Sequence, residues 1–266
     1  MQTLARRLGR VHLFLAFLGL ALASGRPQQE VTIATHAVAG RISYLVGEGG
    51  NIGVSAGADG VLIVDDEFER LAPKIEAALG KLSKSAPRFL INTHHHGDHT
   101  DGNKHFGKIA TVLAHENVRA RLLEDGAPPQ SLPVVTYADG ISLYFNGEEI
   151  RVLHVANGHT DGDSVVWFTG SNVVHLGDLY FQVGYPYIDT GAGGDVEGLI
   201  AGLKRLRQQF PADVKLIPGH GELTGLAGLD EYLSMLETIT ARVREQRSQG
   251  HGVAAMLAAG VTRDYD

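Results

Sequence analysis

Residues 93–99 read THHHGDH, which places four histidines and one aspartate within seven positions. They follow an apolar run, residues 89–91, that is typical of a buried strand. Residues two apart in an extended chain point to the same side. We therefore expect His94 and His96 to converge on one point, while His95 points elsewhere as an outward neighbour of the site.

The same stretch continues with two more candidate ligands. The chain is expected to turn into a short helix through Asn103, so that Asp98 and His99 face a second point nearby. A histidine-rich surface loop or a purification tag would have a similar composition. A tag is terminal, however, whereas this run lies mid-chain between an apolar segment and Gly102. We interpret residues 93–99 as a metal-binding motif.

The composition narrows the classes of protein and partner. A chain of 266 residues with 44% hydrophobic content can bury a full core, which favours a single domain of mixed α/β type. The formal net charge of −7 repels phosphate backbones, so we expect a small-molecule substrate and no nucleic-acid partner. The chain has no cysteine, so any metal must be held by nitrogen and oxygen. No pattern indicates the oligomeric state.

The N-terminal residues have the pattern of a bacterial export signal. Three arginines within the first ten residues precede an uncharged, apolar run over residues 13–23. A basic head before about a dozen apolar residues is typical of a secretory signal and is short for a membrane span. We expect residues 1–23 to be a signal peptide and residues 24–266 a single secreted or periplasmic domain without stable membrane association. An uncleaved membrane anchor is the alternative.

Alternating and apolar segments predict two sets of short strands, each accompanied by helices. An Asn-Gly pair at residues 146–147 predicts a hairpin. This order favours two half-domains whose sheets stack with helices outside. The strands are expected at residues 31–35, 42–46, 52–56, 61–64, 88–92, 110–114, 141–145, 150–155, 164–168, 173–176 and 214–217. The helices are expected at residues 71–82, 116–123, 195–210 and 229–249.

Three further candidate ligands, His159, Asp178 and His220, follow predicted strands. Each lies beside a glycine, which lets the backbone turn sharply. Each alone is equally well explained as a capping residue. Together with the four candidates in residues 93–99 they give seven nitrogen or oxygen ligands at strand ends, which indicates one shared site.

The ordered motifs THxHxDH (93–99), GHT (158–160), GD (177–178) and PGHG (218–221) resemble those of the metallo-β-lactamase superfamily of hydrolases. The resemblance extends over nearly all of residues 24–266. It implies the metallo-β-lactamase fold, an αββα sandwich of the α/β (α+β) class, with a dinuclear metal site at one edge of the two sheets. By motif position it implies a first metal held by His94, His96 and His159, a second held by Asp98, His99 and His220, and Asp178 as the bridge.

The implied ligands suit hydrolysis. Three neutral imidazoles leave the charge of the first metal largely uncompensated, so the metal lowers the pKa of a bridging water towards neutrality. Asp98 is the expected catalytic residue, because it can accept a hydrogen bond from the resulting hydroxide and aim it. Two zinc ions per chain are the expected cofactor, and iron or manganese would fit the same ligands. Asp65 resembles the superfamily's acidic residue that orients the histidine loop.

We therefore expect a dinuclear zinc hydrolase of a small ester, lactone or amide, with β-lactams among the candidates. Many lactamases place a lysine shortly after the position of Asp178, but no lysine or arginine lies between Gly170 and Leu203. Two alternatives are a mononuclear-iron sulfur dioxygenase and a thioester hydrolase of the glyoxalase II kind. A non-catalytic relative would be expected to have lost ligands, and all seven positions are filled here.

Overall fold

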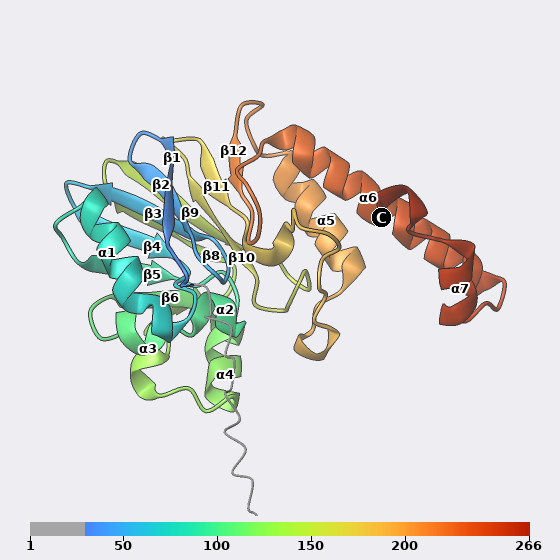
Figure 1. Cartoon of the computed structure of the whole chain (residues 1–266), viewed down its shortest axis with the longest axis horizontal. Coiled ribbons are helices and arrows are strands. Elements are labelled where there is room, and N and C mark those ends of the chain that lie inside the picture. Colours follow the sequence, from blue (N-terminus) through green and yellow to red (C-terminus); the bar gives the residue numbers. More distant parts are fainter. Residues whose placement is uncertain (1–29) are drawn as a thin grey trace, which may run out of the picture. The chain divides into compact units, whose positions relative to one another are not determined.

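Two β-sheets stack face to face and carry the site at one edge (Figure 1). The computed structural model describes residues 30–266, so the predicted signal peptide, residues 1–23, lies outside the described residues. The first sheet has seven strands in the order β1-β2-β3-β4-β5-β6-β7, and the second has five in the order β12-β11-β10-β9-β8. Within residues 30–266, no helix has the length and apolar character that a membrane span requires.

The first sheet combines an antiparallel meander, from β1 to β4, with parallel strands, from β4 to β7. Short glycine-containing turns join its first four strands in antiparallel pairs, whereas longer crossovers make the pairs from β4 to β7 parallel. The end of β5 therefore delivers the histidine-rich loop to the edge of the sheet. The strands are β1 (Ala34–Ala39), β2 (Ile42–Val46), β3 (Ile52–Gly57), β4 (Gly60–Val64), β5 (Pro87–Ile91), β6 (Thr111–His115) and β7 (Val135–Tyr137).

The second sheet begins with the expected hairpin. Asn146 and Gly147, at its tip, both have positive φ (54° and 83°), as a two-residue hairpin turn requires. All pairs are antiparallel except β11 and β12, so β9, β11 and β12 run in the same direction and end at the same edge. The strands are β8 (Gly140–Phe145), β9 (Glu148–His154), β10 (Ser164–Phe168), β11 (Val173–His175) and β12 (Lys215–Ile217).

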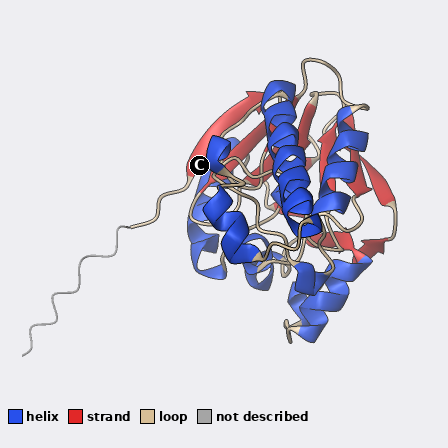
Figure 2. Cartoon of the chain, turned by 90° about the vertical axis from the view of Figure 1, so that its right-hand side faces the viewer, coloured by secondary structure: helices blue, strands red, loops and turns tan. Residues whose placement is uncertain are grey.

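Helices cover the outer faces of both sheets, which confirms the predicted αββα sandwich (Figures 1 and 2). Helix α1 packs Ile75 and Leu79 on the first sheet. Helices α5 and α6 pack Leu203 and Leu229 on the second. The helices are α1 (Ala72–Leu82), α2 (Gly97–Thr100), α3 (Asn103–Phe106), α4 (Glu116–Glu124), α5 (Val196–Arg207), α6 (Leu226–Ser248) and α7 (Val253–Ala259).

Three elements differ from the sequence-based prediction. The first strand was expected at residues 31–35 but is β1, Ala34–Ala39. Val31 and Ile33 pack against the core beside α1 instead, whereas β1 is mostly exposed and irregular in register, so it lacks an alternating pattern. Strand β7 was not predicted because it has only three residues, and α7 was not predicted because it buries no side chain.

Phe168→Ala should destabilise the sandwich strongly. Phe168 is fully buried between the two sheets, and removing a buried aromatic ring leaves a cavity that costs about 3–5 kcal/mol. The free energy of unfolding, measured by urea denaturation, checks this. Tyr144→Ala on β8 is the control, because the ring of Tyr144 is 81% exposed. Equal stability losses in the two variants would contradict the assigned core.

Candidate metal centre

Loops that follow the ends of β5, β9, β11 and β12 deliver the seven predicted ligands to one place. The loop after β5 and helix α2 carry four of them, and the other three follow β9, β11 and β12 respectively. These strands belong to both sheets and are far apart in sequence, so stacking of the sheets brings the ligands together. The donor atoms fall into two groups that share one carboxylate: His94, His96, His159 and Asp178 form the first, and Asp98, His99 and His220 form the second.

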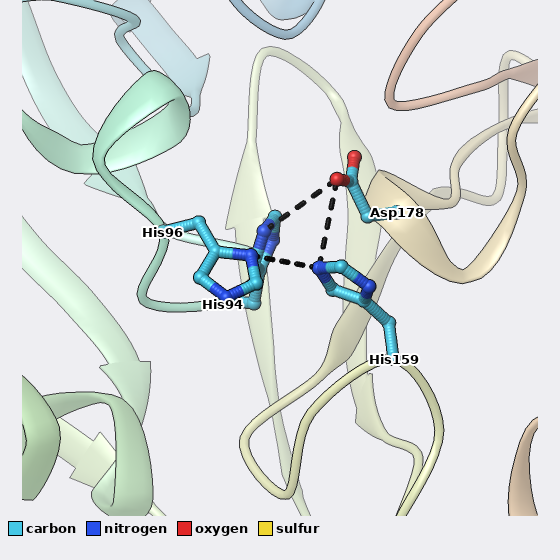
Figure 3. Close-up of side chains that lie close together, drawn as sticks. All are labelled: His94, His96, His159 and Asp178. Carbon is cyan, nitrogen blue, oxygen red and sulfur yellow. Dashed lines mark hydrogen bonds and ion pairs between the residues drawn. The ribbon is translucent and has the colours of Figure 1, made fainter. Parts of the chain in front are cut away.

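In the first group, one donor atom from each residue lies within 4.8 Å of the others (Figure 3). His159 Nε2 is 2.8 Å from His96 Nδ1 and 3.6 Å from Asp178 Oδ2. His94 Nε2 lies 3.8 Å from the same Asp178 oxygen, is buried and has no hydrogen-bond partner. A buried nitrogen without a partner needs an explanation, and a divalent cation among these donors supplies one.

The second group surrounds the other oxygen of Asp178. His99 Nε2 is 3.1 Å and His220 Nε2 is 3.6 Å from Asp178 Oδ1. His220 Nε2 also lies 3.1 Å from Asp98 Oδ2 and 3.3 Å from His99 Nε2. Asp178 therefore presents one oxygen to each group, as a bridging ligand must.

Buried Asp65 fixes the histidine loop, in agreement with its predicted orienting role. Its Oδ1 accepts the backbone N–H of Thr93 at 2.7 Å, and its Oδ2 accepts the Thr93 hydroxyl at 2.7 Å and His99 Nδ1–H at 2.8 Å. Because the hydroxyl donates to Asp65, it accepts from His94 Nδ1–H at 3.0 Å. The imidazoles of His94 and His99 therefore both turn Nε2 towards the centre.

His159 is oriented by the backbone of another loop. Its Nδ1–H donates to the carbonyl oxygen of Tyr187 at 2.7 Å, which leaves Nε2 as a lone pair. Tyr187 itself is 60% exposed, and its ring centroid lies 6.0 Å from those of His96 and His159. Tyr187 thus lies at the site, whereas Tyr180, closer to Asp178 in sequence, is buried against Tyr232 of α6.

One glycine is needed for close approach to the bridging carboxylate. A Cβ on Gly219 would lie 1.9 Å from Asp178 Oδ1. The backbone N–H of Gly219 instead donates to the carbonyl oxygen of Gly177 at 2.8 Å, which ties the two ligand loops together. The PGHG motif therefore has a steric reason: a side chain at Gly219 would push the carboxylate away.

The pKa values of the histidines are shifted in opposite directions in the two groups. Burial lowers the pKa of His94 well below its usual value and also lowers the pKa of His159, so both are neutral ligands. Burial opposes the charge of His99, but Asp178 and Asp65 together raise its pKa well above the usual value. Burial likewise opposes the charge of His220, but the carboxylates of Asp178 and Asp98 raise its pKa to about 9.

The carboxylates complete this charge network. Burial would raise the pKa of Asp178, but the charge of His99 holds it well below its usual value. Burial would also raise the pKa of Asp98, and the hydrogen bond from His220 lowers it overall. The carboxylates of Asp98 and Asp178 thus favour positive charge in the second group, and a divalent cation would supply that charge.

Two further residues lie beside the first group. His95 belongs to neither group of predicted ligands, and its ring packs 4.6 Å from that of His96. Asp189, in the loop before α5, contacts His96 and was missed by the sequence analysis, since it lies outside every motif. His115 and His154 stack 3.7 Å apart and take part in neither group of ligands.

Comparison with known proteins supports the same family. The family model described as "Metallo-beta-lactamase superfamily" matches residues 48–220. Hydroxyacylglutathione hydrolase from Rhodospirillum rubrum is 29% identical over 173 residues, 64% of this chain and 60% of that protein. Metallo-beta-lactamase type 2 from Bacteroides fragilis is 24% identical over 138 residues, 51% of this chain and 54% of that protein.

A solved structure shows the same fold. The metallo-beta-lactamase from Pontibacter korlensis superposes with a TM-score of 0.67 and 18% identity, covering 77% of this chain and 99% of that chain. This chain spans about half to three fifths of the length of the curated relatives it matches. The family model matches more than half of the chain, and the histidine and aspartate cluster lies within the matched residues and the fold. The chain therefore belongs to the metallo-beta-lactamase superfamily.

Proposed function

We propose that this centre holds two zinc ions and hydrolyses a small ester, lactone or amide. The observation that carries the proposal is the position of Asp178, whose two oxygens face two separate groups of imidazoles. The lone pairs of His96 and His159 also converge at 2.8 Å, an arrangement that a cation stabilises. All donors are nitrogen or oxygen, and histidine with carboxylate suits zinc.

Bound zinc would supply Lewis acidity and lower the pKa of a water molecule to near neutrality. His94, His96 and His159 would hold one ion, Asp98, His99 and His220 would hold the other, and Asp178 would contribute to both. Asp98 is one-third exposed, so it can reach a substrate as well as the centre. Its carboxylate is the proposed acceptor that orients the attacking water and takes up its proton.

A neutral substrate fits the surroundings of the centre. No lysine or arginine lies between Gly170 and Leu203, the stretch that includes Asp178 and Tyr187. Arg121 lies nearby but is engaged by both oxygens of Asp161, at 2.8 and 2.7 Å. The exposed ring of Tyr187 gives the site an uncharged aromatic surface in place of a cationic side chain. We propose that the chain acts on such small molecules after export, as a secreted or periplasmic enzyme that does not bind nucleic acid.

Thioester hydrolysis is the second candidate, because several similar curated relatives are hydroxyacylglutathione hydrolases. The name of these relatives indicates a glutathione thioester, which is anionic. Turnover of a chromogenic cephalosporin, a simple lactone, an aryl ester and a hydroxyacylglutathione by the zinc-loaded protein would separate the candidates. Faster turnover of the lactone or the ester supports the first candidate. Turnover of the thioester alone would replace it by the second.

Asp98→Asn should abolish most turnover while the fold is retained. An amide cannot take up the proton of the attacking water, so kcat should fall by about 10²–10⁴. Steady-state kinetics checks this, with circular dichroism as a measure of folding. Asp101→Asn is the matched control, since Asp101 lies in the same segment but pairs with Lys104. An unchanged kcat in Asp98→Asn would contradict the assigned role.

Zinc binding at pH 7.5 should release protons from the second group and few from the first. His99 and His220 have raised pKa values, about 9 for His220, so this group holds protons at pH 7.5 in the metal-free protein that the first group lacks. Imidazole must be neutral to bind a metal, so zinc displaces these protons. His94 and His159, with lowered pKa values, have none to release.

Titration calorimetry in buffers of different ionisation enthalpy counts the released protons. The count should fall as the pH rises through 9, because His220 then loses its proton before zinc arrives. His220→Gln should remove part of the release. Equal release in both binding steps would contradict this assignment.

A further inference from the structure

A hydrogen bond between His96 and Asp189 lies on the outer side of the first group. The Nδ1 atom of His96 faces His159 Nε2 at 2.8 Å, whereas its Nε2 atom lies 2.9 Å from Asp189 Oδ2. An ionised carboxylate only accepts hydrogen bonds, so Nε2 carries the imidazole proton. The lone pair of a neutral His96 must then lie on Nδ1, towards the centre.

Asp189 is itself held in place on three sides. Its backbone N–H donates to the carbonyl oxygen of His159 at 2.9 Å, and its carbonyl oxygen accepts the N–H of Gly194 at 2.8 Å. Its Oδ1 accepts the N–H of Ala192 at 3.0 Å, which caps the turn Thr190–Ala192. The carboxylate therefore has one oxygen committed to its own loop and the other to His96.

The same loop also orients the neighbouring ligand. The carbonyl oxygen of Tyr187, two residues earlier, accepts His159 Nδ1–H at 2.7 Å. Residues 187–194 thus fix the tautomers of two histidines through one side chain and one backbone carbonyl. This loop is separated from His96 by more than ninety positions in sequence.

We propose that Asp189 is a positioning residue of the metal centre. It selects the tautomer of His96 that presents Nδ1 to the metal, and its charge makes Nδ1 a stronger ligand. This role rests on the proposed function, because it takes His96 as a ligand. Loss of such a carboxylate partner lowers metal affinity by about 10–100-fold.

A third metal among His95, His96 and Asp189 is the competing interpretation, since their donor atoms lie within 4.8 Å of one another. Such an ion would need a lone pair on His96 Nε2 in addition to the one on Nδ1. A neutral imidazole has only one such lone pair. The observed contact with an acceptor instead places a proton on Nε2, which favours the positioning role.

Two substitutions at Asp189 separate its functions. Asp189→Ala removes both side-chain contacts. Asp189→Asn keeps the shape but has one oxygen and one NH₂ group, so it cannot accept from both Ala192 and His96. If its oxygen caps the turn, its NH₂ group faces His96 Nε2 and favours the wrong tautomer. Asp161→Asn is the matched control, because Asp161 is similarly exposed, pairs with Arg121 and has no contact with a proposed ligand side chain.

Zinc affinity is measured by competition with a chromophoric chelator, so the readout does not depend on turnover. Asp189→Ala should lower the affinity for one of the two zinc ions by about 10–100-fold and leave the affinity for the other unchanged. Asp189→Asn should lower the affinity for the same zinc ion, and Asp161→Asn should change neither affinity. In a His96→Ala background, Asp189→Ala should have no further effect, because its action passes through His96.

Nitrogen-15 NMR of the His96 ring gives a second readout. The wild-type ring should carry its proton on Nε2, and the Nδ1–H form should gain population in Asp189→Asn. Wild-type zinc affinities in both Asp189 variants would overturn the proposal. So would a third zinc ion that is lost in Asp189→Ala, which would make Asp189 a ligand. A wild-type chain that binds no zinc would instead overturn the proposed function, and the role of Asp189 with it.

Discussion

The candidate metal centre is organised around one buried carboxylate, that of Asp178, which is only 4% exposed. A buried charge is unfavourable unless opposite charge surrounds it. Here His99 faces it at 3.1 Å, and its two oxygens point to separate groups of imidazoles. The same need for positive charge accounts for the raised pKa of His99 without metal and for the affinity that we expect for a divalent cation.

The packing of the two sheets brings the imidazoles close to Asp178. The loop after β5 belongs to the first sheet, and the loops after β9, β11 and β12 belong to the second. Strands of common direction end at a common edge, so each sheet contributes a partial ligand set that is complete only when the sheets pack. Leu62, Val166 and Phe168 in the core between the sheets thus hold the metal centre together at a distance.

The parts that could be predicted from sequence have local signals. The spacing of residues 93–99 placed His94 and His96 together, and apolar runs located most strands of both sheets. Strand β1 was predicted too early in the sequence and helix α7 was not predicted, because neither has a regular buried face. Asp189 escaped because its contact with His96 arises from the path of an irregular loop, which has no periodicity to read. Tertiary packing, rather than motif, decides such contacts.

Metal content tests the central claim most directly. The protein, purified without chelator, should contain two zinc ions per chain by elemental analysis. The same sample should hydrolyse a lactone, an ester or a β-lactam without consuming oxygen. About one iron per chain, with oxygen consumption and no hydrolysis, would contradict the account and assign the chain to oxygen chemistry on the same three histidines.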